Sequence, residues 1–458
     1  MTGTLRAATA DAQLRERMGA ALGLEVASAN LTGVATLESP YPVSDLAVAS
    51  VAAVGAGVSG VLEAAGFGWR PATVRREHAD AWFSSGVRPV GWVAPTPWDP
   101  IAGDYRAADG WIRLHTNAPA HRQAALRVLG VDADRDAVAR AVAIWHADQL
   151  EAEVVAEGGC AATLRRPEEW ARHPQGVAVA AEPLVARETT GASEAASRWA
   201  PTLERPLAGL LVLDLTRVLA GPVATRVLAG LGAEVLRIDP TGWDEPALAH
   251  EMTLGKRTAR LDAHDPAGLA RLTRLLAQAD VIVHGYRSDA LERLGLGAEV
   301  RRETRPGLVD VSLDAYGFTG PWAARRGFDS LVQMSSGIAD AGMRAAVADH
   351  PVPLPVQALD QATGYLMAAA ALAGLRQRLL DGTGSEVRLS LARTAVELEA
   401  ARGLPRATRY SAPELTDGAL LQSEWGPVRV LPAPFALDGV RVAWERPPRA
   451  FGSDNPTW

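Results

Sequence analysis

The chain has 458 residues, which at the usual size of roughly 100 to 200 residues per domain corresponds to two or three domains with a substantial core. Its net charge of -7, with 22% charged residues, leaves no basic excess for binding a phosphate backbone, so we expect no nucleic-acid partner. The single cysteine, Cys160, excludes an internal disulfide and a zinc site built from several thiolates. Such a chain fits the reducing cytosol, and we expect a cytoplasmic protein.

The first 65 residues indicate neither a signal peptide nor a membrane span. Met1 to Glu25 carries charged residues, among them Asp11 and Arg15, where a signal peptide needs an apolar stretch. The longest uncharged run, Leu46 to Leu62, is shorter than the ~20 residues of a membrane-spanning helix. We therefore predict a buried helix there and no membrane partner.

The remainder of the first half has mixed patterns. Helical periodicity covers Asp45 to Ala65, Ala120 to Leu129 and Asp134 to Glu157, while Asp104 to His115 is typical of a hairpin. These patterns predict a smaller α+β domain over residues 1–185.

A polar segment follows. Residues 186–205 are rich in small and polar residues and show neither a helical nor a strand period. This composition predicts a linker that leads into a large domain over residues 206–458.

The large domain opens with a strand, a helix and a second strand. Leu210 to Leu215 is an apolar run apart from Asp214, Pro222 suits the first turn of a helix that ends near Leu231, and Glu234 to Ile238 is a second strand. The alternation then continues with a strand at Thr258–Leu261, a helix at Pro266–Leu276, a strand at Val281–Val283, a helix at Ala290–Leu294 and a strand at Leu308–Leu313. Fully apolar strands alternating with helices predict an α/β fold, a doubly wound, Rossmann-like parallel sheet with helices on both faces.

Two features of this domain suggest contacts with phosphate groups. The turn Thr216 to Pro222 joins the first strand to its helix, where a doubly wound fold places phosphates on free N–H groups. It lacks the G-x-G-x-x-G pattern, so a dinucleotide site is not favoured over a plain turn. Gly255-Lys256-Arg257 precedes a strand, and Lys256 is the only lysine among 46 basic residues. A solvated basic pair and a cation that reaches a diphosphate are both compatible with this position.

Asp360 stands at the start of a helix. It follows a proline-rich loop and precedes the Ala/Leu-rich segment Gln361 to Leu380. One interpretation is a helix cap, and the other is a carboxylate nucleophile that the helix N-terminus keeps ionised. The chain has no H-E-x-x-H and no G-x-S-x-G motif, so we expect neither a metal site nor a serine hydrolase.

Five stretches between Pro206 and Gly384 together resemble the family III (CaiB/BaiF-type) CoA-transferases. They read PLAGLLVLDLTRVLAGPVATRVLAGLGAEVLRID, GKRTARLD, ADVIVHGYRSDALERLGLG, GFTGPWAARRGFDSLVQMSSG and ALDQATGYLMAAAALAGLRQRLLDGTG. The resemblance implies that Asp360 is the nucleophile of an enzyme that moves CoA from an acyl-CoA donor to a small carboxylic acid. It further implies a substrate CoA thioester with no permanently bound cofactor, and a homodimer that is interlocked in relatives. The positions that the resemblance assigns to the CoA site are Val218, Leu219, Ala220, Lys256, Tyr286 and Arg293.

The chain also departs from that family. His284 to Asp289 replaces the usual Glu-Asn-Phe-Arg-Pro-Gly, and no glycine-rich loop follows Gly384. Asp104 to Gly176 resembles the small region that normally follows the catalytic half, so the chain looks permuted or fused. A non-catalytic homologue that binds acyl-CoA is therefore one alternative.

A second alternative is an acyl-CoA racemase of the same family, which needs a base on each face of the α-carbon. Related racemases carry histidine where this chain has Phe328, between Gly327 and Asp329. Phenylalanine takes no proton, so this alternative requires His350 to act from the neighbouring loop.

Overall fold

The computed structural model describes residues 8–192, 199–286, 290–406, 410–411 and 415–458. Its centre is a seven-stranded sheet in the order β10-β9-β8-β11-β12-β13-β7. Six strands run parallel, and β7 pairs antiparallel with β13 at one edge. The strands are β7 (Ala186–Ala192), β8 (Leu211–Leu215), β9 (Glu234–Asp239), β10 (Lys256–Arg260), β11 (Val281–His284), β12 (Val309–Asp314) and β13 (Thr383–Ser390).

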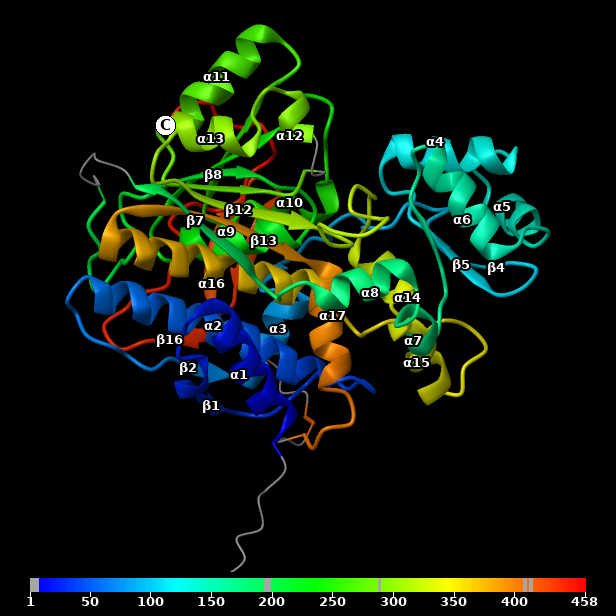
Figure 1. Cartoon of the computed structure of the whole chain (residues 1–458), viewed down its shortest axis with the longest axis horizontal. Coiled ribbons are helices and arrows are strands. Elements are labelled where there is room, and N and C mark those ends of the chain that lie inside the picture. The colour runs from blue at the N-terminus through cyan, green and yellow to red at the C-terminus, as the bar shows by residue number, and fades with distance from the viewer. Residues whose placement is uncertain (1–7, 193–198, 287–289, 407–409, 412–414) are drawn as a thin grey trace, which may run out of the picture.

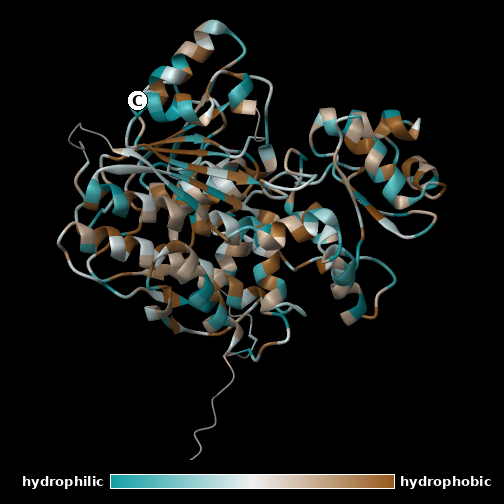
Figure 2. Cartoon of the chain, in the orientation of Figure 1, coloured by the Kyte–Doolittle hydropathy of each residue, from teal (hydrophilic) through white to brown (hydrophobic). Residues whose placement is uncertain are grey.

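Successive side chains of each strand enter two different cores. In β8, Val212 faces a core shared with the long helix α16, whereas Leu213 faces a second core under α11. Because both faces are covered, β8 and β11 consist mainly of apolar residues, and Figure 2 shows the strands at the centre of the sheet largely in brown. The predicted doubly wound α/β fold is confirmed. The helices of the two faces are α9 (Ala220–Gly230), α16 (Ala358–Asp381) and α17 (Leu391–Ala400) on one side, and α11 (Pro266–Leu276), α12 (Ala290–Arg293) and α13 (Ala298–Thr304) on the other (Figure 1).

The N-terminal segment packs onto α16. Its helix α2 (Val43–Ala64) approaches so closely that a Cβ on Gly57 would lie 2.9 Å from the Cβ of Leu372. A Cβ on Gly60 would likewise lie 2.8 Å from Cδ of Arg376. Because the contacts advance toward the carboxyl end of both helices, the two helices run parallel. Among the described residues, α2 is the one helix long and apolar enough to cross a membrane, and it is buried inside the fold, as predicted. The other elements of this segment are α1 (Ala10–Leu22), η1 (Val26–Ser28), β1 (Asn30–Thr32), β2 (Thr73–Arg75) and α3 (Arg76–Ser84).

A small domain with its own core lies to the side of the sheet domain (Figure 1). It is an antiparallel sheet, β4-β5-β6, covered by three helices. The predicted hairpin is its β4–β5 pair, and the predicted helix over residues 134–157 is two helices separated by residues 143–146. The elements are β4 (Gly103–Arg106), β5 (Trp111–Leu114), α4 (Pro119–Leu129), α5 (Arg135–Val142), α6 (Ala147–Ala156) and β6 (Ala161–Thr163).

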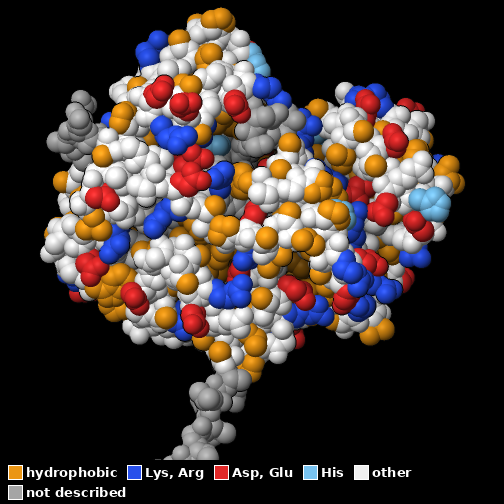
Figure 3. Space-filling view, viewed as in Figure 1, with side chains coloured by type: hydrophobic (Ala, Val, Ile, Leu, Met, Phe, Trp, Pro, Cys, Tyr) orange, Lys and Arg blue, Asp and Glu red, His pale blue; other side chains and the backbone are white. Residues whose placement is uncertain are grey.

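The remaining elements surround these two domains. They are β3 (Val87–Pro89), α7 (Pro167–Trp170), α8 (Pro174–Ala181), α10 (Pro246–Met252), α14 (Asp329–Ser335), α15 (Ile338–Ala345), β14 (Ala419–Ser423), β15 (Gly426–Val430) and β16 (Phe435–Ala436). On the face shown in Figure 3, basic and acidic side chains are interspersed.

Two predicted boundaries are wrong. Residues 1–185 do not form one domain, because α1 and α2 belong to the core of the sheet domain. Residues 186–192 are the edge strand β7 instead of a linker, while residues 193–198 lie outside the described residues. An edge strand exposes polar side chains on both faces, so its sequence resembles a loop.

Candidate active site

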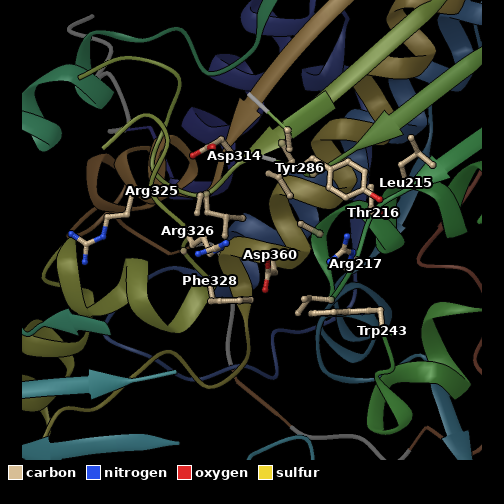
Figure 4. A pocket seen from close by; sticks show the side chains of 18 of the residues that line it. Leu215, Thr216, Arg217, Trp243, Tyr286, Asp314, Arg325, Arg326, Phe328 and Asp360 are labelled. Atoms are coloured by element: carbon tan, nitrogen blue, oxygen red, sulfur yellow. The ribbon is translucent and has the colours of Figure 1, made fainter. Parts of the chain in front are cut away.

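A cavity of about 660 Å³ opens at the carboxyl ends of β8, β11 and β12. The chain runs from β8 outward to β9 and β10, and then returns to β11 on the other side of β8. The cavity therefore lies at the point where the strand order reverses, which is where open α/β sheets bind ligands. Figure 4 shows side chains from both sides of this point, among them Thr216 and Tyr286, facing the same space.

Asp360 lines this cavity from the first turn of α16. Only 6% of the residue is exposed. Burial and the nearby negative charge of Asp329 raise the pKa of Asp360 well above its usual value. In the part of the chain that the structure describes, Asp360 does not cap its own helix.

That cap comes from Asp329, at the start of α14. Its Oδ2 accepts hydrogen bonds from the backbone N–H groups of Leu359 at 2.9 Å and Asp360 at 3.0 Å. Its Oδ1 accepts from the side-chain amide of Gln333. Burial raises the pKa of Asp329 to about 6, although these hydrogen bonds oppose the rise. The cavity thus contains a nucleophile candidate that is held by a second buried carboxylate.

The turn after β8 forms part of the cavity wall. Val218 and Ala220 line the cavity, whereas Leu219 packs into the core beneath them. Val218 has a φ of 65°, and its N–H donates to the Glu245 carboxylate at 2.9 Å. That N–H group is therefore not available to a phosphate, and for Leu219 the predicted position on the cavity wall is wrong.

Arg217, which the sequence interpretation missed, extends from the same turn into the cavity. Its guanidinium lies 4.6 Å from the centre of the Trp243 ring and 5.0 Å from that of Tyr286. Arg293, on α12, lines the same region. The structure therefore brings the predicted residues Tyr286 and Arg293 together with Asp360 around one cavity, and adds Arg217.

Lys256 lies elsewhere. It is the first residue of β10, its side chain has no exposed surface, and it is absent from the cavity wall. Its Nζ donates to Asp214 Oδ2 at 3.0 Å, to Pro222 O at 2.9 Å and to Thr225 Oγ1 at 2.6 Å. Burial lowers the pKa of Lys256 to about 8, although Asp214 opposes the shift. The prediction that Lys256 holds a diphosphate is therefore wrong, and so is the alternative of a solvated basic pair. The side chain instead links the start of α9 to β8.

The small domain and a loop of the large domain form the opposite wall. His121 on α4 lines the cavity, and its ring meets that of Phe328 edge to face at 5.9 Å. His115 stacks on Phe328 at 3.7 Å. Burial lowers the pKa of His115 to about 3 and that of His121 to about 4, so both rings are neutral at pH 7. His350 is exposed and does not line this cavity, so the residue required for a racemase is not in place.

Arg325 and Arg326 connect that loop to the small domain. Arg325 donates to the Ala161 carbonyl at 2.8 Å and lies 3.9 Å from the centre of the Trp322 ring. Arg326 donates to the Gly158 carbonyl at 3.0 Å, and both arginines line the cavity. The small domain of the same chain therefore closes one side of the site.

The sheet and the position of the cavity define an α/β protein with a ligand site at the switch point of its sheet. The profile of CoA-transferase family III matches residues 207–443, and the chain belongs to that family. The match includes β8 to β13, the turn at Arg217 and Asp360.

Relatives with curated names are similar to this chain over part of their length. An acyl-CoA transferase of Gibberella moniliformis is 32% identical over 302 residues, which are 61% of this chain and 53% of that protein. The human succinyl-CoA:glutarate CoA-transferase is 35% identical over 193 residues, or 39% of this chain and 44% of that protein. A crystal structure of a hypothetical protein from Mycobacterium tuberculosis aligns at 33% identity over 43% of this chain and 57% of that one, with a TM-score of 0.39. The chain spans about half the length of the curated relatives that it matches.

Proposed function

We propose that this protein transfers CoA from an acyl-CoA donor to a small carboxylic acid, with Asp360 as the nucleophile. The observation that supports this most directly is the position of the Asp360 carboxylate, which lines a cavity at the switch point of the sheet. A cavity of about 660 Å³ has room for part of an acyl-CoA beside that carboxylate.

The proposed reaction consists of two pairs of acyl transfers. An Asp360 oxygen attacks the donor thioester, so that a C–O bond forms, the C–S bond breaks and the CoA thiolate leaves with the electron pair. The thiolate then attacks Cγ of Asp360, which gives an aspartyl-CoA thioester and releases the donor acid. The acceptor carboxylate attacks this thioester and expels the thiolate, and the thiolate finally attacks the acceptor carbonyl. This last step frees acceptor-CoA and the Asp360 carboxylate.

The side chains around the cavity fit the two ends of such a substrate. Arg217 and Arg293 supply positive charge for the phosphates of CoA, and Trp243 and Tyr286 offer ring faces beside them. On the other side, Phe328 and the small domain cover the region near Asp360, which would keep water away from the anhydride and the thioester.

The proposal includes no permanently bound cofactor, and it places the reaction in the cytoplasm without a membrane or nucleic-acid partner. A homodimer, implied by the resemblance to interlocked relatives, is also part of the proposal. The small domain of the same chain already forms one side of the cavity, so a dimer would not be needed to complete the active site.

Oxygen labelling tests this mechanism. With an ¹⁸O-labelled acceptor acid, one acceptor oxygen is left on the Asp360 carboxylate and passes to the released donor acid in later turnovers. We expect mass spectrometry to detect label in the peptide that contains Asp360, and none in Asp360→Asn. A racemase would instead exchange the α-proton in D₂O without transferring CoA, and a non-catalytic binder would do neither.

A further inference from the structure

Asp329 and Asp360 form a buried carboxylate pair at the N-terminus of α16. Asp329 is 1% exposed and Asp360 6%, and one oxygen of Asp329 accepts the backbone N–H groups of both Leu359 and Asp360 in the first turn of the helix. We propose that Asp329 is the positioning residue for the nucleophile, and that its negative charge favours the acylated over the free form of Asp360. This inference rests on the function proposed above.

The hydrogen bonds fix where Asp360 stands. The N–H of Asp360 itself is one of the two donors, so its backbone is held while its side chain remains free to react. Gln333 extends the contact, because its Oε1 accepts the N–H of Leu354 at 2.8 Å, in the proline-rich loop before α16. We call the hydrogen bonds of Asp329 and Gln333 the clamp, because together they join α14, the loop and the first turn of α16.

The negative charge of Asp329 affects the equilibrium between free and acylated Asp360. A helix N-terminus ordinarily stabilises a carboxylate through its free N–H groups, but here Asp329 occupies two of them. Two carboxylates in one buried region repel each other when both are ionised, and Asp329 is the neighbouring charge that disfavours ionised Asp360. The anhydride and the aspartyl-CoA thioester are neutral at Asp360. Acylation therefore removes the repulsion, and the donor acid carries the negative charge into solvent.

A double variant separates the charge from the hydrogen bonds. In Asp329→Asn/Gln333→Glu, the Asn oxygen can accept the N–H groups of Leu359 and Asp360, and its amide can donate to the new carboxylate. That carboxylate also accepts the N–H of Leu354. Every bond of the clamp is retained, while the charge moves one side chain away from Asp360.

The experiment measures how much protein carries CoA. Wild type and double variant are incubated with acetyl-CoA or succinyl-CoA plus a fixed concentration of the matching free acid, and intact-protein mass spectrometry gives the aspartyl-CoA fraction. We expect the equilibrium ratio of adduct to free enzyme to fall about tenfold or more in the double variant, as one pKa unit of like-charge interaction requires. Circular dichroism should be unchanged.

The outcomes distinguish this inference from the proposed function. Equal adduct levels in a folded double variant would overturn the role of Asp329 alone, whereas no adduct in wild type would overturn both proposals. If the double variant does not fold, Asp329→Asn alone gives the same readout, because the oxygen that accepts both backbone N–H groups can be retained.

Discussion

Lys256 Nζ lies 3.0 Å from Asp214 Oδ2, and neither side chain has any exposed surface. The ammonium group also donates to Pro222 O and Thr225 Oγ1, at the start of α9. This lysine therefore contributes to the fold beneath the cavity, because it neutralises a carboxylate buried at the centre of the sheet.

Lys256→Met should accordingly destabilise the protein by about 3–5 kcal/mol, because it removes the ion-pair partner of the buried Asp214. Urea unfolding followed by circular dichroism measures this loss. The neighbouring Arg257 is a matched control. It pairs with Glu234 at 3.0 Å nearer the surface, so Arg257→Met should cost less than about 1 kcal/mol. Calorimetry at a temperature where the variant is folded should give wild-type CoA affinity, and weakened binding at unchanged stability would contradict this role.

Asp360→Asn should abolish CoA transfer and stabilise the free enzyme. Both carboxyl groups of the pair have raised pKa values in the folded protein, so the folded state holds their protons to higher pH than the unfolded state does. Their stabilising effect is present below the unfolded pKa near 3.9 and is lost as pH rises through the folded pKa. The gain from the Asn variant should therefore be larger at pH 8 than at pH 5.

Asp45 provides the control for that experiment. It opens α2, which runs parallel to α16, so the two aspartates stand at corresponding ends of paired helices. Asp45 is ion-paired with the buried Arg76 at 2.9 Å and does not line the cavity. We expect Asp45→Asn to leave the transfer rate of the folded protein unchanged, while its thermal stability shifts with the loss of the Arg76 ion pair. Thermal melts with a coupled thioester assay report both, and loss of transfer in folded Asp45→Asn would show that the second helix also acts in catalysis.

The pattern of the sequence predicted the sheet far better than the contacts between its elements. A strand covered on both faces consists mainly of apolar residues, as in Leu210–Leu215. Such a run can be recognised from a few neighbouring residues of the sequence. Lys256 was misplaced because the residue before a strand and the first residue of a strand have the same sequence signal. The direction of its side chain depends on Asp214, 42 positions away.

The nucleophile candidate was found by its local position at a helix start, but its partners were not. Asp329 is 31 residues from Asp360, and His121 reaches the cavity from a different domain. The Gly-Phe-Asp segment that carries Asp329 was interpreted only through Phe328, where a racemase has histidine. The carboxylate of Asp329, directly after Phe328, was a signal that could have led to its contact with the start of α16.

Arg217→Ala should weaken CoA binding by about 1.5–3 kcal/mol, the range for a hydrogen bond to a charged group. Arg217→Lys should recover only part of this, because an ammonium group does not stack on Trp243 and Tyr286 as a planar guanidinium does. Calorimetric titration with CoA measures both variants. Arg271→Ala, on the exposed side of α11, should bind CoA as wild type does. Wild-type affinity in Arg217→Ala would remove this residue from the binding site.

A fragment of residues 201–458 should not give a soluble, monodisperse protein. It would lack α2, and the face of α16 that α2 covers would then be exposed over several turns. It would also lack Trp82, which stacks on Trp444 at 5.0 Å, and β7, which protects the edge of β13. Large exposed apolar faces and open sheet edges lead to association. Size-exclusion chromatography with light scattering should show aggregates, and co-expression with residues 1–200 should restore a discrete species. A folded, monodisperse fragment would show that the N-terminal segment is an accessory that the sheet domain does not require.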